Sequence, residues 1–89
     1  MTEHHKRQLE RHRATLVQNM NPREVIVDLR SQGILTDSDA QNINCAGGMN
    51  AQNEVLLDLL LRKPDQAFED FRDALMMSKQ RHLARQLKN

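Results

Sequence analysis

The sequence predicts an all-α domain in which six helices pack as an antiparallel bundle, with residues 1–89 forming one domain. Three observations support this fold class. The chain has only three Gly and two Pro in 89 residues, so few positions interrupt a helix. Apolar residues recur at intervals of three and four, which is the period of an amphipathic helix. No useful stretch alternates apolar and polar residues, as a strand with one buried face would.

The first two helices are predicted over residues 4–19 and from residue 22 to about residue 33. Four residues form the apolar stripe of the first helix: Leu9, Leu16, Val17 and Met20. The second helix has a clear start, because Asn21 is a favourable N-cap residue and Pro22 suits the first helical position. Gly33 follows as a left-handed C-cap. Its inward residues are Val25, Ile26 and Leu29.

The third helix begins at the capping box of residues 36–39, where Thr36 and Asp39 can bond to each other's backbone N–H, and it ends near Asn44. After a loop with two glycines, a fourth helix is predicted over residues 51–62. This helix is apolar on several faces, as expected for the centre of a bundle. Its core residues are predicted to be Val55, Leu56, Leu59 and Leu60, with Leu57 and Leu61 widening the stripe.

The fifth helix opens at Pro64, and the sixth follows Ser78 as its N-cap. Five residues of the fifth helix have helical spacing and form its buried face: Ala67, Phe68, Phe71, Ala74 and Leu75. Met76 and Met77 end it and are expected to fill gaps in the core. The last helix turns Leu83, Ala84 and Leu87 inward.

Composition excludes several classes of protein. Thirteen basic and 12 acidic residues give a net charge of +1, which argues against a nucleic-acid binder that relies on bulk charge. A chain this short has little room for a large enclosed active site. Its longest apolar run, 55–61, falls far short of the ~18 residues of a spanning helix, so no membrane partner is expected. One Cys suits a reducing compartment, and we expect a cytoplasmic protein, with the nucleus also compatible.

No catalytic or metal-binding constellation is visible. Cys45 lies in the sequence NCAGG, and we interpret it as a thiol in a loop rather than a nucleophile. The four histidines lack the paired spacing of a structural zinc site, and we expect them to be exposed. No Gly-rich phosphate loop and no Ser-His-Asp arrangement can be drawn. The sequence therefore predicts a non-catalytic chain without cofactors.

The residues resemble those of caspase recruitment domains (CARDs) of the death-fold superfamily. The resemblance is carried by segments 65–75 (DQAFEDFRDAL), 80–87 (QRHLARQL), 12–17 (HRATLV) and 33–36 (GILT). Within the family the sequence is most similar to the prodomain of the caspase-two type of initiator caspase, through segments 4–6, 52–60 and 79–83. Two departures stand out. Pro64 lies one place earlier than in the Gly-Pro of many members, and residues 51–54 lack the basic side chains that some relatives have there.

Charge is segregated along the chain: residues 1–19 carry a net +2, residues 20–61 a net −4 and residues 62–89 a net +3. The resemblance implies that a basic face on the first and fourth helices of one molecule meets an acidic face on the second and third helices of another. By position, the basic candidates are Arg11, Arg13, Arg62 and Lys63. The acidic candidates are Glu24, Asp28, Asp37 and Asp39. Complementary fields of this kind favour selectivity more than affinity.

The resemblance therefore implies a protein-interaction module that recruits an initiator caspase to an adaptor for activation by proximity in apoptosis. Its partner would be an adaptor's CARD or another copy of itself, and such heterologous contacts can repeat into a helical oligomer. Two alternatives remain open. One is the CARD of an adaptor or inflammatory signalling protein that has no protease domain. The other is a helix-turn-helix DNA-binding domain, which the acidic start of the third helix disfavours.

Overall fold

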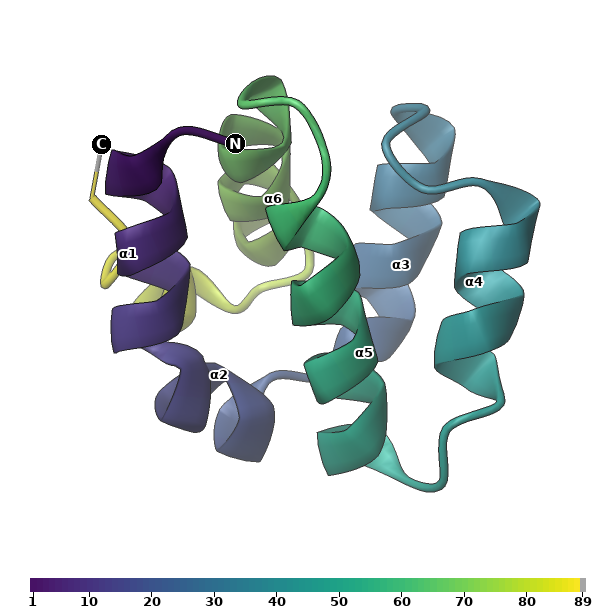
Figure 1. Cartoon of the computed structure of the whole chain (residues 1–89). Coiled ribbons are helices and arrows are strands. Elements are labelled where there is room, and N and C mark those ends of the chain that lie inside the picture. The colour runs from purple at the N-terminus through teal and green to yellow at the C-terminus, as the bar shows by residue number, and fades with distance from the viewer. Residues whose placement is uncertain (89) are drawn as a thin grey trace.

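The computed structural model describes residues 1–88 and confirms the all-α antiparallel bundle (Figure 1). Within these residues the chain forms seven helices and no strand. In order they are α1 (Glu3–Arg11), α2 (Arg13–Asn19), α3 (Pro22–Ser31), α4 (Asp37–Asn44), α5 (Met49–Leu61), α6 (Gln66–Met77) and α7 (Arg81–Ala84). In Figure 1, α1 and α2 form one edge of the molecule, α3 and α4 form the other, and α5 and α6 lie between these edges.

The helix predicted over residues 4–19 is divided into α1 and α2. The break lies at His12, whose φ of −103° and ψ of 11° depart from helical values. The backbone N–H of His12 still donates to the carbonyl of Gln8 at 3.2 Å, so the chain turns without losing that bond. After the turn, α2 packs against α5 and buries Leu16. Tertiary packing here overrides an unbroken apolar period.

The inward face of the central helix, α5, overlaps the predicted one, and the predicted core residues Leu56 and Leu60 are confirmed. Four of its side chains are buried: Asn53, Leu56, Leu57 and Leu60. Val55 and Leu59 pack against the core but are only partly buried, so the centre of the buried face is shifted from the predicted one. The inward face begins at Asn53, a polar residue that the apolar pattern could not identify. The predicted inward faces of α3 and α6 are confirmed, and both Phe68 and Phe71 are fully buried.

The predicted starts of α3 and α4 are confirmed. The side chain of Asn21 accepts from the backbone N–H of Arg23, with Pro22 at the first helical position. Thr36 accepts from the backbone N–H of Asp39 at 3.0 Å, and the Asp39 carboxylate accepts from that of Thr36 at 3.1 Å. These two reciprocal bonds complete the capping box.

The end of α6 corrects the prediction for Ser78. Its hydroxyl donates to the carbonyls of Ala74 and Leu75, so Ser78 closes α6 rather than opening the next helix. Lys79 then adopts a φ of 64°, the left-handed conformation that ends many helices. The last helix, α7, starts only after Gln80 and is four residues long. The chain therefore makes a tight turn here before α7.

Two buried amides hold the joint between α2 and α3, where Met20 is fully buried. The Asn53 amide nitrogen donates to the carbonyls of Val17 at 3.0 Å and Met20 at 2.8 Å. The Gln80 side chain accepts from the backbone N–H of Asn21 at 2.8 Å and donates to its carbonyl at 3.0 Å. Buried backbone groups need such partners, and these come from α5 and from the segment after α6.

The start of the chain is held against α6 through Asp65. This carboxylate accepts from the backbone N–H of Thr2 at 2.9 Å and lies 2.6 Å from Nδ1 of His5. The His5 ring stacks on Phe68, with centroids 4.0 Å apart. His5 is therefore mostly buried, contrary to the expectation of an exposed histidine. The bond from Thr2, and then that from His5, lowers the pKa of Asp65 to about 2.

Asn53→Ala should lower the free energy of unfolding by roughly 2 kcal/mol or more, because buried carbonyls that lose their partner cost ~1–3 kcal/mol each. Chemical denaturation monitored by circular dichroism measures the change. Asn50→Ala, an exposed position on the same helix, is the matched control and should stay within about 0.5 kcal/mol of wild type. Equal stabilities for the two variants would contradict the assigned role of Asn53.

Asp65 should make the fold sensitive to acid. A carboxyl whose pKa is lower in the folded state stabilises the fold above its unfolded value of 3.8, and this contribution is lost as the pH falls towards 2. Asp65→Asn removes the titrating group, so its melting temperature should fall less than that of wild type between about pH 4 and pH 2. Thermal melts across this range test the effect. Asp73→Asn, an exposed position on α6, should retain the wild-type profile.

Candidate protein-interaction site

Of the four cations predicted for the basic face, two form ion pairs within residues 1–88 and two do not. Arg11 and Arg62 are exposed and form no ion pair within residues 1–88. Arg11 lies in the last turn of α1, and Arg62 follows the end of α5. Arg13 and Lys63, in contrast, are bonded to carboxylates of the same chain. The structure thus separates two free cations from two that already have partners.

Arg13 is the centre of an ion-pair network between α1, α2 and α5. Its guanidinium donates to Glu54 at 2.7 Å, to Asp58 at 2.8 Å and to Glu10 at 3.2 Å. Burial alone would lower the pKa of Arg13, but the hydrogen bonds to Asp58 and Glu54 outweigh this effect and raise the pKa. One guanidinium faces three carboxylates, so this network by itself carries more negative than positive charge.

Lys63 and Asp39, predicted on opposite faces, bond to each other at 2.7 Å. The side chains are only 23% and 16% exposed. The bond from Lys63, together with the backbone bond from Thr36, lowers the pKa of Asp39. This pair fastens the start of α4 to the end of α5. Asp39 thus has two structural duties, as a helix cap and as the partner of Lys63.

The remaining acidic candidates divide between two places. Asp37 is exposed at the start of α4 and forms an ion pair with Arg30 of α3. Glu24 and Asp28 lie one turn apart on α3, beside α6, and neither forms an ion pair in the described part of the chain. One oxygen of Asp28 is buried and lacks a hydrogen-bond partner among the described residues. The free acidic charge is therefore on α3.

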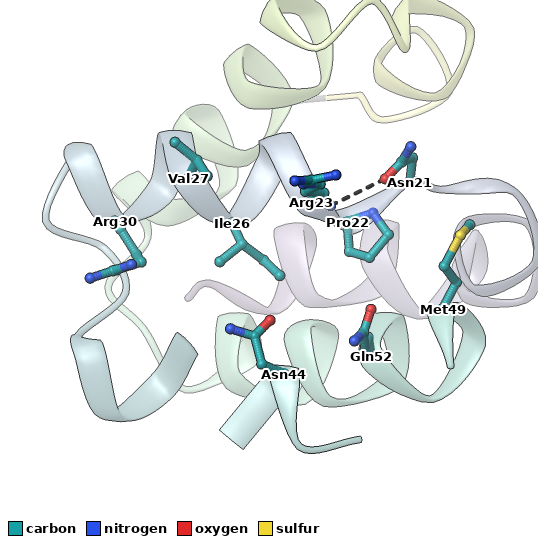
Figure 2. A pocket seen from close by; sticks show the side chains of 9 residues that line it. All are labelled: Asn21, Pro22, Arg23, Ile26, Val27, Arg30, Asn44, Met49 and Gln52. Atoms are coloured by element: carbon teal, nitrogen blue, oxygen red, sulfur yellow. Dashed lines mark hydrogen bonds between the residues drawn. The ribbon is translucent and has the colours of Figure 1, made fainter. Parts of the chain in front are cut away.

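Two grooves flank α3. The first, of about 550 Å³, lies between α3 and the facing ends of α4 and α5. Figure 2 shows Arg23, Val27 and Arg30 along α3, with Asn44 and Gln52 across the groove. The second, of about 380 Å³, lies between α3 and α6, and Glu24 and Asp28 line it. Arg23 lines both grooves, whereas Arg30 lines only the first and the two carboxylates line only the second.

Sequence reasoning missed the apolar part of this surface. Val27 is 63% exposed and Met77 is 76% exposed, and both line the groove between α3 and α6. Met76 is exposed as well, so the expectation that these methionines fill core gaps was wrong. The available signal was helical phase: Phe71, Ala74 and Leu75 already occupy the inward face of α6, which leaves the next two residues outside it.

Other reactive side chains in residues 1–88 form no site. Cys45 is exposed in the loop before α5, and no three His, Cys, Asp or Glu residues in this range are grouped so that they could hold a metal ion. His4 and His82 are exposed as expected. None of the helices in the described range has the length and apolar character needed to cross a membrane.

Comparison with known proteins agrees with the fold. The sequence matches the model of the caspase recruitment domain over residues 6–89, so the chain belongs to the caspase recruitment domain family. It is also similar to caspase-2 of Gallus gallus, with 30% identity over 84 residues. That match covers 94% of this chain and 20% of the relative, so the chain spans about a fifth of the length of the curated protein. Caspase recruitment domains are non-catalytic modules that bind one another.

The Arg13 network should contribute measurably to stability. Arg13→Ala removes the bonds to Glu54, Asp58 and Glu10 and leaves three carboxylates facing one another, so we expect a loss of about 1 kcal/mol. Denaturation at low and at high salt measures the loss, which should shrink at high salt as repulsion is screened. Arg11→Ala, two residues away and unpaired within residues 1–88, is the matched control and should change stability by less than about 0.5 kcal/mol.

Proposed function

We propose that this module recruits an initiator caspase to the CARD of an adaptor protein in the cytoplasm or nucleus. Recruitment would concentrate the attached protease domains, so that they activate one another by proximity during apoptosis. The physical basis is effective concentration, since tethering turns a second encounter into an intramolecular one. Membership of the family and the likeness to caspase-2 of Gallus gallus support the proposal.

The observation that carries the docking part of the proposal is the placement of charge at two opposite edges. The proposed basic side comprises Arg11, Arg13, Arg62 and Lys63, on or next to α1, α2 and α5. The proposed acidic side comprises Glu24, Asp28, Asp37 and Asp39, on α3 and α4. Figure 1 shows α1 and α3 at opposite edges of the bundle. A contact between such edges uses a different surface on each partner, as a heterologous contact requires.

Within each side, the free charges are the ones we expect to matter most. Arg11 and Arg62 on the basic side, and Glu24 and Asp28 on the acidic side, need not break an ion pair before they meet a partner. Arg13 and Lys63 would have to release their own carboxylates first. We therefore assign Arg13 and Lys63 mainly to holding the helices that present the free charges.

Charge reversal tests this proposal. Of two double variants, Arg11→Glu with Arg62→Glu and Glu24→Lys with Asp28→Lys, the one that alters the side facing an adaptor CARD should bind it more weakly, since like charges in contact oppose docking. The variant that faces the partner should lose about tenfold or more in dissociation constant, equal to ~1.4 kcal/mol. Pull-down followed by calorimetry against the adaptor CARD measures the effect, and circular dichroism checks the fold.

Arg85→Glu provides the control, since this exposed cation follows α7 and belongs to neither proposed side. This substitution changes the net charge by two units, half the change in either double variant, but it should leave the affinity close to that of wild type. If both double variants keep the fold and bind as tightly as the control, docking through these charges is refuted.

A further inference from the structure

We propose that the groove between α3 and the facing ends of α4 and α5 binds a small molecule that carries two or more phosphate groups. We call it the arginine groove, because the charged residues that line it are Arg23 and Arg30. The rest of its lining consists of Asn21, Pro22, Ile26, Val27, Asn44, Met49 and Gln52. Binding of such a molecule does not require the recruitment contact proposed above.

The arginine groove has the size and shape of a small-molecule site. Its volume of about 550 Å³ falls within the range of about 300–1,000 Å³ that is usual for ligand pockets. Figure 2 shows Ile26 of α3 pointing across the groove toward Asn44 of α4, while Pro22 faces Gln52 of α5. Side chains from three helices therefore converge on one space, with apolar surface between the polar groups.

The charge of the groove favours an anion. Its lining in the described residues contains two arginines and no acidic side chain. Arg23 forms no ion pair within residues 1–88, and Arg30 bonds only to Asp37, which does not line the groove. The arginines are seven residues apart on α3, about two turns or roughly 10 Å along one helix face. Both guanidinium groups can thus reach one ligand that has more than one anionic group.

The hydrogen-bond donors of the groove favour phosphate among anions. Each guanidinium has five N–H donors and each side-chain amide has two. The amides of Asn44 and Gln52 form no hydrogen bond with the rest of residues 1–88, and Asn21 uses only its oxygen, as the cap of α3. A phosphate group offers three strong acceptor oxygens and accepts two parallel bonds from one arginine. A ligand with several phosphates therefore uses more of these donors than a carboxylate does.

Asp37 competes with the ligand for one of the two arginines. The side chain of Arg30 is 46% exposed and that of Asp37 is 86% exposed, and an exposed ion pair contributes little to stability. A phosphate group with a charge of about −2 can therefore take the place of Asp37 on Arg30. Removal of the Asp37 charge should strengthen ligand binding, which a purely structural role of Arg30 would not explain.

Isothermal titration calorimetry of the whole chain tests the proposal, with ATP and with inositol hexakisphosphate as separate probes in low salt without divalent metal ions. At least one probe should bind saturably, with a dissociation constant below about 1 mM. Arg23→Gln and Arg30→Gln should each weaken binding by about tenfold. Arg23→Lys keeps the charge but loses the two-pronged donor, so it should also bind more weakly. Asp37→Asn should tighten binding by about twofold or more.

Arg85→Gln is the matched control, because it removes an exposed cation that does not line the groove. It should bind the probes as wild type does, and circular dichroism checks the fold of every variant. Nuclear magnetic resonance locates the ligand: the side-chain amide signals of Asn44 and Gln52 should shift on titration, whereas that of Gln86, an amide outside the groove, should not.

The two probes distinguish the sources of the shared phosphate chemistry. Tighter binding of ATP than of inositol hexakisphosphate, with no binding of adenosine, indicates a nucleoside polyphosphate; the reverse order indicates an inositol polyphosphate. The proposal is overturned if neither probe binds saturably, if Arg85→Gln weakens binding as much as Arg23→Gln does, or if adenosine binds as tightly as ATP.

One further result would assign the groove to a different occupant. If neither probe binds, but Arg23→Gln with Arg30→Gln weakens binding to an adaptor CARD, the groove receives an acidic protein surface and the small-molecule site is refuted. Conversely, a chain that binds a probe through Arg23 and Arg30 but binds no adaptor CARD would support the ligand site while refuting the proposed recruitment.

Discussion

The arrangement of this bundle depends on the joint between α2 and α3, where the chain turns inside the core. Met20 is fully buried there. Between α2 and α3 the backbone does not follow the hydrogen-bond pattern of a helix, so the carbonyl and N–H groups of this segment need other partners. Asn53 from α5 and Gln80 from the turn after α6 provide them. Each amide reaches a segment that is more than 30 residues away in sequence. Four helices thereby meet at one point, and the position of α3 relative to α5 is fixed by hydrogen-bond geometry as well as by packing.

The position of α3 relative to α5 determines which charged side chains line the grooves on the surface. The groove between α3 and α5 is lined by both arginines of α3, and the groove between α3 and α6 is lined by both of its carboxylates and by Arg23. A rotation of α3 by one residue position, about 100°, would move these charges out of their grooves. Asn21 and Pro22 set the first turn of α3 at the joint itself, so the constraint that satisfies buried backbone also sets which charges each groove presents.

The parts of this structure that were predictable from sequence are those set by neighbouring residues. The starts of α3 and α4 follow from Asn21 with Pro22 and from Thr36 with Asp39, and the buried face of α6 follows from its spacing. The errors concern interactions between distant segments. The first helix breaks at His12, after which α2 packs on α5. Arg13 forms ion pairs with carboxylates that lie 41 and 45 residues further along the chain. No local pattern marks Asn53 as buried, since Asn is usually exposed.

The pairing of Arg13 bears on how such a surface can bind at all. A single exposed ion pair is worth only ~0–1 kcal/mol, in part because two long side chains must be ordered to form it. Around Arg13 the ordering has already occurred on folding, since Arg13 holds Glu10, Glu54 and Asp58 in place. A partner cation that meets them loses less freedom than it would against mobile carboxylates, which is the advantage of preorganisation. The guanidinium of Arg13 therefore cancels one negative charge but keeps the three carboxylates ordered for a partner cation.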